Sequence, residues 1–327
     1  MNAPRHDVAA VVIGRNEGAR LERCLTSLKG QTDRLIYVDS GSIDGSIRFA
    51  ASVGAEVVRL DQSSPFTAAR ARNAGFDALR AQGLPAYVQF VDGDCAVAAG
   101  WIAKGSAALD DDPNLGLVTG WRKEIYPTRN VYHAMAEVEW HRPAGDIRAC
   151  GGDMMVRAAD FDTVGGFDPT VIAAEDDEFC LRLGASGKAL LRLPEPMTLH
   201  DLDTNSFGQW WKRSVRNGHG FAQLGAMHEG HFVAERRRVW LYGAALPLVF
   251  LAALVFGPRI LALLPPLLLA ASWAKTALGL RRAGQSPSSA LQQALLLTAS
   301  KIPNLQGMIT FYLRRKRGAA MTLIEYK

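Results

Sequence analysis

The sequence predicts an α/β fold, with a Rossmann-like, mostly parallel sheet covered by helices on both faces, followed by a C-terminal transmembrane helical hairpin. Short continuous apolar runs alternate with helical patterns in the first half of the 327-residue chain, which is typical of buried parallel strands. Polar clusters follow several of these runs. Two nearly uncharged runs, each about 20 residues long and therefore of bilayer length, lie in the last third of the chain.

Strands and helices are expected to alternate before residue 95. Continuous apolar runs predict the strands, and an apolar face at helical spacing predicts the helices; in the first helix that face is Leu21, Leu25 and Leu28. The expected order is strand 8–14, helix 20–30, strand 34–42, helix 44–54, strand 55–60, helix 66–83 and strand 86–94. Because crossovers between parallel strands are right-handed, these elements form one Rossmann-like sheet.

From about residue 115 the alternation is less regular. The helix expected over 174–187 begins on four acidic residues, which suit the positive end of a helix dipole, and it ends at a glycine. The other expected elements are a strand over 115–125, a helix over 128–141, a strand or turn over 151–157, a loop over 164–169, short strands within 188–200, and a basic, aromatic amphipathic helix over 205–224.

Two apolar runs, 239–257 and 260–280, are predicted to be transmembrane helices joined by a tight turn. Arginines 236–238 precede the first run, and Arg281 and Arg282 follow the second, so the positive-inside rule places both ends in the cytoplasm. The alternative is a soluble core, because two prolines and a lysine weaken the second run. The stretch 290–313 is more polar and predicts an interfacial or re-entrant segment within an amphipathic tail, 287–327.

Composition limits the class of protein. The net charge is +5, and much of the excess lies in short basic tracts beside the apolar runs, which favours a membrane surface over nucleic acid as the partner. The four cysteines form no CxxC pair, and no N-terminal signal peptide is recognised. We therefore expect reduced thiols, no structural zinc site and a cytoplasmic catalytic portion.

Three polar clusters follow predicted strands and are expected to meet at one edge of the sheet. They are residues 15–17, 39–42 and 92–94. Ligands of such sheets bind at the carboxyl ends of the strands. In the third cluster Asp92 and Asp94 are separated by one glycine. Buried carboxylates need compensation, so a divalent metal, a basic neighbour or solvent at the strand end must accompany them.

Five segments resemble, in order and spacing, the motifs of the family 2 glycosyltransferases, bacterial nucleotide-sugar-dependent enzymes of the GT-A fold. They are VVIGRNEG, VDSGSIDGS, ARARNAG, FVDGD and AEDDEFCLRL, within residues 8–220. The resemblance implies a membrane-anchored enzyme of envelope or exopolysaccharide synthesis. It divides the chain into a GT-A glycosyltransferase domain, 1–232, and a membrane-anchoring region, 233–327.

By this resemblance Asp92-Gly93-Asp94 is the DXD motif, which holds Mn²⁺ or Mg²⁺ against the diphosphate of the donor. Such an ion stabilises the negative charge that develops on the leaving diphosphate. Asp94 is then the metal ligand, and Asp92 lies nearer the ribose or the metal. His200 follows a late strand, where some GT-A enzymes supply a further ligand; a structural histidine is the alternative.

The nucleotide is expected to contact residues that follow the first two strands and residues of the helix before the DXD strand. By resemblance Asp39 accepts a hydrogen bond from an imide N–H such as that of uracil, which favours a UDP-sugar, although an Asx turn before Gly41 is compatible with the same position. Arg72 and Asn73 are assigned to the nucleotide site, with Arg70 as an alternative to Arg72 and surface bases as another. Glu17 is assigned there too.

The acids at the start of helix 174–187 match the ED motif of the family. An inverting transfer needs a carboxylate that deprotonates the acceptor hydroxyl, and the resemblance gives that role to Asp176, with Glu175 beside it. Acids that only stabilise the helix start are the alternative.

Further contacts with the sugar or acceptor are assigned by looser matches. Asp153 belongs to a segment that lies near the sugar or acceptor in related sequences. The residues Gln209, Trp210, Trp211 and Arg213 loosely match the Q-x-x-R-W motif of processive synthases, but no Arg-Trp pair follows. An amphipathic helix at the membrane surface explains the same aromatic residues.

The sequence therefore predicts a metal-dependent inverting glycosyltransferase that moves a sugar from a nucleotide-diphosphate donor to a polyprenyl-linked or other envelope glycan at the cytoplasmic face of the inner membrane. One alternative is a non-catalytic nucleotide-sugar-binding membrane subunit of a polysaccharide synthase complex; another is a processive synthase, for which two spans are too few without partners. A dinucleotide-binding oxidoreductase is disfavoured because GRNEG after the first strand is not GxGxxG.

Overall fold

The computed structural model describes residues 7–257, 259–322 and 324, and the chain divides into two compact units. The first unit extends to Tyr126 and includes Ala136–Leu202. The second consists of Pro127–Met135 and the chain from Asp203 onward. Pro258 of the expected hairpin turn, and four of the last residues of the expected tail, lie outside the described residues.

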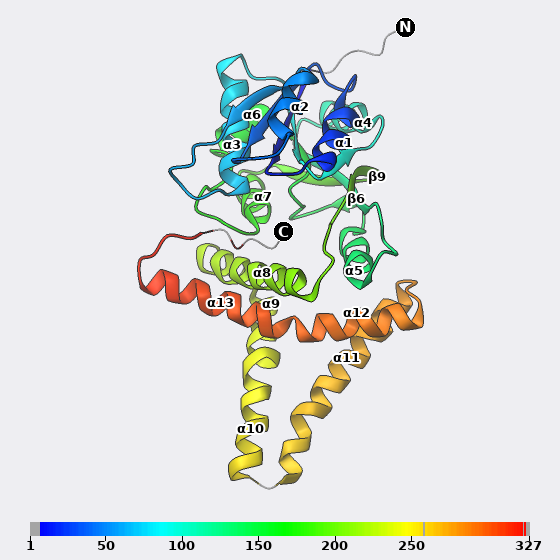
Figure 1. Cartoon of the computed structure of the whole chain (residues 1–327), viewed down its shortest axis with the longest axis vertical. Coiled ribbons are helices and arrows are strands. Elements are labelled where there is room, and N and C mark those ends of the chain that lie inside the picture. Colours follow the sequence, from blue (N-terminus) through cyan, green and yellow to red (C-terminus); the bar gives the residue numbers. More distant parts are fainter. Residues whose placement is uncertain (1–6, 258, 323, 325–327) are drawn as a thin grey trace. The chain divides into compact units, whose positions relative to one another are not determined.

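The first half of the sheet is parallel, as predicted, and its strands run in the order β3-β2-β1-β4. They belong to the blue and cyan part of the chain in Figure 1. In sequence order these strands are β1 (Val8–Gly14), β2 (Arg34–Asp39), β3 (Glu56–Arg59) and β4 (Tyr87–Asp92). The carboxyl ends of β1, β2 and β4 therefore meet at one edge, with Gly14 paired to Asp39 and Ile13 paired to Asp92.

Beyond β4 the sheet is mixed. Strand β8 (Met154–Arg157) runs antiparallel to both β4 and β6 (Leu115–Glu124), whereas β9 (Ala189–His200) runs parallel to β6. Two short strands, β5 (Cys95–Val97) and β7 (Gly145–Asp146), pair antiparallel with β9. Strand β9 is one element, and the expectation of several short strands there is wrong. The β6–β9 register shifts where Pro196 pairs with Trp121, so an irregularity accommodates the proline instead of ending the strand.

Helices cover both faces of the sheet, because successive side chains of each strand point to opposite sides. On β1, Ala9, Val11 and Ile13 pack on α3 (Ala68–Ala81), α6 (Ala158–Thr163) and α7 (Glu175–Ala185). The alternate residues pack on α1 (Ala19–Leu28), α2 (Ser46–Ser52) and α4 (Trp101–Asp111). The short helix α5 (Val131–Trp140) begins in the second unit and ends in the first.

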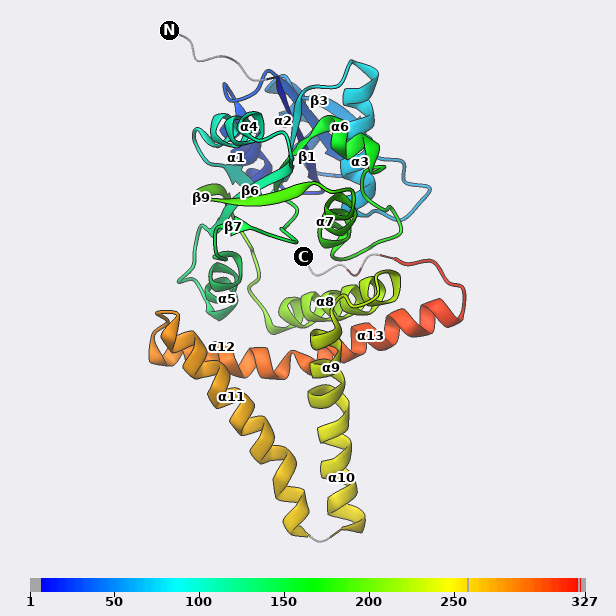
Figure 2. The same ribbon diagram turned by 180° about the vertical axis from the view of Figure 1, so that it is seen from behind.

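The second unit contains two helical stretches that are long and apolar enough to cross a membrane, Val233–Phe256 and Ile260–Arg282, with mean hydropathies of 2.2 and 1.5. Only 17% of each apolar window is buried, which is unlike the core helix of a soluble protein. The first stretch comprises α9 (Val233–Trp240), a π-helical turn (Leu241–Ala245) and α10 (Leu246–Phe256); the second comprises a 3₁₀ turn (Arg259–Leu263) and α11 (Leu264–Arg282). Together they could form the predicted hairpin (Figure 2).

The remaining helices of this unit are α8 (Phe207–Met227), α12 (Pro287–Ala299) and α13 (Lys301–Lys316). Helices α8 and α13 lie side by side in Figures 1 and 2. Glycines permit this close approach: a Cβ atom on Gly307 of α13 would lie 1.9 Å from the carbonyl oxygen of Val215, and one on Gly218 of α8 would lie 2.0 Å from that of Asn304. Residues 203–232 thus pack with the second unit; the functional boundary at 232/233 stays a prediction.

Candidate active site

The site begins at the carboxyl end of β2, where the Asp39 carboxylate is buried and closes an Asx turn. Its Oδ2 atom accepts from the backbone N–H groups of Gly41 and Ser42, both at 2.9 Å, and its Oδ1 atom accepts from the Tyr37 hydroxyl at 3.0 Å. Burial raises the pKa of Tyr37, and the hydrogen bond with Ser42 offsets only part of this rise, so this hydroxyl stays protonated and can donate. The expected Asx turn is present.

The DXD segment and the acidic helix are joined by one buried arginine. Arg72 of α3 donates to Asp92 Oδ1 at 2.6 Å and to Glu175 Oε1 at 2.8 Å, and only 2% of its side chain is exposed. A Cβ atom on Gly152 would lie 2.1 Å from the guanidinium, so the chain needs glycine there to make room for it. The basic neighbour expected for the DXD segment is therefore Arg72, which pairs with Asp92.

Asp92 also faces a second arginine. Arg122 of β6 lies 3.4 Å from Asp92 Oδ2 and 2.9 Å from Asp153 Oδ2. Burial alone would raise the pKa of Asp92, but the charges of Arg72 and Arg122 outweigh that effect and lower it. Asp92 is consequently ionised at neutral pH.

Asp153 is wholly buried and fully engaged by the protein. Its carboxylate accepts from the Asp92 backbone N–H at 2.9 Å, the Thr198 hydroxyl at 2.7 Å and the Arg122 guanidinium. This geometry does not favour the predicted contact of Asp153 with sugar or acceptor. Instead, Asp153 ties the end of β4 to β6 and β9.

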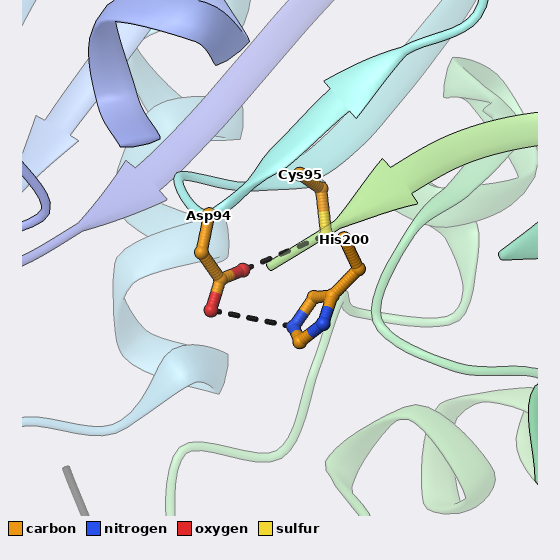
Figure 3. A group of neighbouring side chains, drawn as sticks. All are labelled: Asp94, Cys95 and His200. Atoms are coloured by element: carbon orange, nitrogen blue, oxygen red, sulfur yellow. Dashed lines mark hydrogen bonds and ion pairs between the residues drawn. The ribbon is translucent and has the colours of Figure 1, made fainter. Parts of the chain in front are cut away.

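Asp94 and His200 face one another at the start of β5 and the end of β9 (Figure 3). Asp94 Oδ2 lies 3.3 Å from His200 Nε2, and His200 Nδ1 lies 3.7 Å from Glu124 Oε2. Burial alone would lower the pKa of His200, but Asp94 and Glu124 outweigh it and raise the pKa. A metal-binding histidine commonly pairs its second nitrogen with a carboxylate, so a divalent cation fits this donor set.

The thiol of Cys95 belongs to the same group of side chains. Cys95 Sγ lies 3.5 Å from Asp94 Oδ1, and the ligand atoms of Asp94, Cys95 and His200 lie within 4.8 Å of one another (Figure 3). Burial, then the charge of Asp153, raises the pKa of Cys95, so without a cation the thiol is protonated.

The acidic helix α7 begins on a residue in an unusual conformation. Ala174 has φ 61° and ψ 33°, the left-handed region that costs an alanine about 1–2 kcal/mol. Glu175 then turns inward to Arg72, and Asp176 is only partly buried. Desolvation, followed by the charges of Glu175 and Asp177, raises the pKa of Asp176 well above the usual range for aspartate.

Two other predicted residues lie at the periphery of this network. Glu17 pairs with Arg20 at 2.9 Å, close to the end of β1. Asn73 is joined to the backbone of Phe167 in both directions, through its Nδ2 atom at 2.7 Å and its Oδ1 atom at 2.9 Å. Asn73 thus anchors the loop that leads into α7.

The predicted acceptor-side residues lie on α8 in the second unit. Gln209 forms a capping box with Ser206, Trp210 is buried against Tyr132 and Phe207, and Trp211 donates to Gln306 at 2.9 Å. Arg213 also lies on α8. Their role towards an acceptor stays a prediction.

Sequence reasoning missed Arg122, Glu124 and Cys95. Arg122 and Glu124 occupy alternate positions of a strand that ends in polar residues, a pattern that is typical of a solvent-facing edge, and only pairing with β9 reveals their burial. For Cys95 a signal was available, since it directly follows the second acid of the DXD segment.

Comparison with known proteins identifies the family. Residues 9–159 match the family model described as glycosyl transferase family 2. This part of the chain belongs to the family 2 glycosyltransferases. The match spans the first four strands, the DXD segment and β8, and thus most of the network around Arg72.

Proteins similar to this chain are also named as glycosyltransferases. The pre-mycofactocin glycosyltransferase of Mycobacterium tuberculosis is 28% identical over 243 residues, which cover 69% of this chain and 49% of the relative. The match thus spans about half the length of that relative. Glycosyltransferase AglE of Haloferax volcanii is 23% identical over 232 residues, 66% of this chain and 73% of the relative.

A solved structure is similar over nearly the whole glycosyltransferase. The mannosyltransferase PcManGT from Pyrobaculum calidifontis, in complex with GDP-Man and Mn²⁺, aligns with a TM-score of 0.59 and 18% identity and covers 91% of this chain and 87% of its own. This likeness shows the GT-A fold predicted from the sequence.

Proposed function

We propose that this glycosyltransferase is membrane-anchored and metal-dependent, and that it moves a sugar with inversion from a nucleotide-diphosphate donor to a lipid-linked or other envelope glycan. The acceptor would be reached at the cytoplasmic face of the inner membrane. One observation carries the proposal: Arg72 joins Asp92 of the DXD segment to Glu175, the residue before Asp176. Groups suited to donor binding and a group suited to acceptor activation therefore share one ion network.

The donor diphosphate is assigned to the side of Asp92 and Asp94. A bound Mn²⁺ or Mg²⁺ supplies charge stabilisation for the leaving diphosphate. Asp94 and His200 would hold it, the Glu124 carboxylate lies 3.7 Å from the second ring nitrogen of His200, and Arg72 and Arg122 keep Asp92 ionised. The complex of PcManGT with GDP-Man and Mn²⁺ supports a divalent ion in this fold.

We assign the deprotonation of the acceptor hydroxyl to Asp176. Its raised pKa makes it a stronger base than an exposed aspartate, and it loses its proton nearer to neutral pH. Because the Asp176 side chain is partly exposed, an acceptor can reach its carboxylate, whereas the Glu175 carboxylate is paired with Arg72. Asp176 is therefore the better base of the pair.

The nucleobase is assigned to Asp39. This carboxylate already accepts three protein hydrogen bonds, so only its remaining lone pairs are free for the imide N–H of uracil. Guanine carries a comparable N–H beside a carbonyl. We favour a UDP-sugar and include both bases in the test.

The membrane assignment rests on Val233–Phe256 and Ile260–Arg282, with the arginines of α9 near the start of the first stretch and Arg281 and Arg282 at the end of the second. Basic residues at both ends of a hairpin support a cytoplasmic location of those ends. A hairpin of this kind would keep the enzyme beside a lipid-borne acceptor.

The deciding experiment measures Mn²⁺-dependent transfer from UDP-, GDP- and dTDP-sugars by the detergent-purified protein, with membrane lipid extract as the acceptor source. Asp176→Asn and a chelated sample are run in parallel. We expect one donor to give labelled lipid, and chelator or Asp176→Asn to abolish transfer while nucleotide still binds. Binding without transfer, unaffected by Asp176→Asn, would instead support a non-catalytic binding subunit.

A further inference from the structure

The thiol of Cys95 occupies an unusual place for a cysteine in this protein. It has no exposed area, yet its sulfur points towards Asp94 and His200 and not only into the surrounding apolar layer (Figure 3). On its other side the sulfur lies within 4.8 Å of carboxylate oxygens of Asp92 and Asp153. There Arg122 pairs with both carboxylates, so we place the candidate cation on the side of Asp94 and His200.

The spacing of these atoms suits metal ligands. Around a four-coordinate ion with metal–sulfur distances near 2.3 Å and metal–oxygen or metal–nitrogen distances near 2.1 Å, adjacent ligands lie about 3.3–3.6 Å apart. The observed distances are 3.5 Å from Cys95 Sγ to Asp94 Oδ1 and 3.3 Å from His200 Nε2 to Asp94 Oδ2. Asp94 therefore presents one oxygen to each of the other two ligand atoms.

We propose that Cys95 is a third protein ligand of the cation at Asp94 and His200, and that it makes this site selective for ions that accept sulfur. Ligation replaces the S–H proton by the ion, and the proton leaves to solvent. The inference rests on the proposed function, because it assumes that Asp94 and His200 hold the ion. The inference adds a third ligand residue, Cys95, and a metal selectivity that Asp94 and His200 alone do not imply.

The preference follows from ligand chemistry. Mg²⁺ requires nearly octahedral oxygen ligands, whereas a set of one carboxylate, one imidazole and one thiolate suits Mn²⁺, Co²⁺ and Zn²⁺ in increasing order. Mg²⁺ is then the poorest occupant of the site.

Cobalt absorption gives a direct test, because a thiolate bound to Co²⁺ produces a strong near-ultraviolet charge-transfer band that oxygen and nitrogen ligands do not produce. Co²⁺ is titrated into the metal-free, detergent-purified full chain. We expect the band in the wild type, its loss in Cys95→Ser, and its retention in Cys24→Ser. Cys24 is the matched control, since it lies at the same edge but faces the Asp92 carbonyl oxygen at 3.8 Å.

Affinity provides the second measurement. Cys95→Ser should weaken Zn²⁺ binding by about tenfold or more and change Mn²⁺ binding by less than about threefold. If Cys95→Ser unfolds, Cys95→Ala is used in its place. The wild-type Co²⁺ spectrum alone shows whether a thiolate binds the ion, even without a variant.

The outcomes separate this inference from the proposed function. Wild-type protein that binds Co²⁺ without the thiolate band, or a band that survives in Cys95→Ser, overturns the role of Cys95. If Co²⁺ binding is unchanged in His200→Ala, the ion is elsewhere, and the proposed metal site fails together with its third ligand.

Discussion

Asp177 raises the pKa of its neighbour Asp176 through its negative charge, after desolvation and Glu175 in size. The pKa of Asp177 is itself raised to about 6, mainly by burial. Asp176 acts as a base only when it has lost its proton, so activity should fall as the pH falls through its raised pKa. The acidic limb of the pH–rate profile therefore reports the charge around Asp176.

Replacing Asp177 by Asn removes one of these charges and should lower the pKa of Asp176. We expect the acidic limb of kcat/KM to move to lower pH, while the enzyme stays active. Profiles of wild type and variant measured with saturating Mn²⁺ give the shift. Glu22→Gln, on the exposed side of α1, is the control and should leave the limb in place; a limb that moves upward in Asp177→Asn contradicts the assignment of the base.

How far single residues could be assigned from the sequence depended on their position in an element. The positions of Asp39, Asp92, Asp94 and Asp176 were accessible, because strand ends and helix starts can be located from apolar patterns alone. The burial of Asp153 was not, since it results from three donors that come from β4, β6 and β9. The Asp153 carboxylate holds the DXD segment by accepting a hydrogen bond from the Asp92 backbone N–H.

Three elements are held together by Arg72: the helix α3 that carries it, the strand β4 that ends at Asp92, and the helix α7 that begins at Glu175. Removing a buried partner leaves charges without compensation, which costs far more than losing a surface ion pair. The arginine thus serves stability and site geometry together.

Arg72→Met should destabilise the first unit by about 3–5 kcal/mol and reduce kcat/KM by at least about 100-fold, because α7 loses its link to β4. Thermal unfolding and donor turnover measure the two effects. Arg80→Met is the matched control on the same helix, since Arg80 pairs with Asp77 and Asp162 at the surface and should matter little. Equal losses in both variants would refute the bridging role.

In the second unit, Gly307 allows α13 to approach α8. Gly307→Ala would place a Cβ atom 1.9 Å from the Val215 carbonyl oxygen, so the helices must separate. We expect a loss of about 1–3 kcal/mol, measured by thermal unfolding in detergent. Gly279→Ala on α11, where nothing lies within 4 Å of the added atom, should be neutral or slightly stabilising. A neutral Gly307→Ala would show that the helices are not so close.

At the level of elements, the parallel first half of the sheet was predicted because continuous apolar strands alternate with helices. The helices α4 and α6, and the short strands β5 and β7, were not. β5 and β7 consist of three and two residues, too few for a period to be recognised. The join between β4 and β5 falls inside the DXD segment, so the metal-binding candidate Asp94 lies on a connection between strands.

At the scale of the whole molecule, the membrane assignment predicts which side of the membrane each part of the chain faces. The four native cysteines are buried, so the wild type should not react with a membrane-impermeant maleimide. Ile260→Cys, at the exposed tip of the hairpin, should be labelled in intact cells. Ser288→Cys, beyond α11, should be labelled only after the cells are opened. The reverse pattern would contradict a cytoplasmic catalytic unit, and labelling of neither variant before lysis would contradict a spanning hairpin.

The sequence predicted the division into a sheet-containing part and a helical membrane part, because hydropathy changes sharply after residue 238. It did not predict that residues 203–232 pack with the later helices, or that Pro127–Met135 belongs with them. Packing of this kind depends on interactions between distant segments, such as those of Asn130 with Thr204 and of Tyr132 with Trp210.

That early segment has a consequence for how the protein is made. Pro127–Met135 leaves the ribosome before its packing partners from Asp203 onward exist, and at roughly 5–20 residues per second it waits several seconds for them. During that interval the nascent sheet carries a segment that belongs to a later part of the chain. A soluble fragment that ends after β9 would keep this segment permanently without its partners, and a short polar linker in place of residues 127–135 should make such a fragment easier to produce.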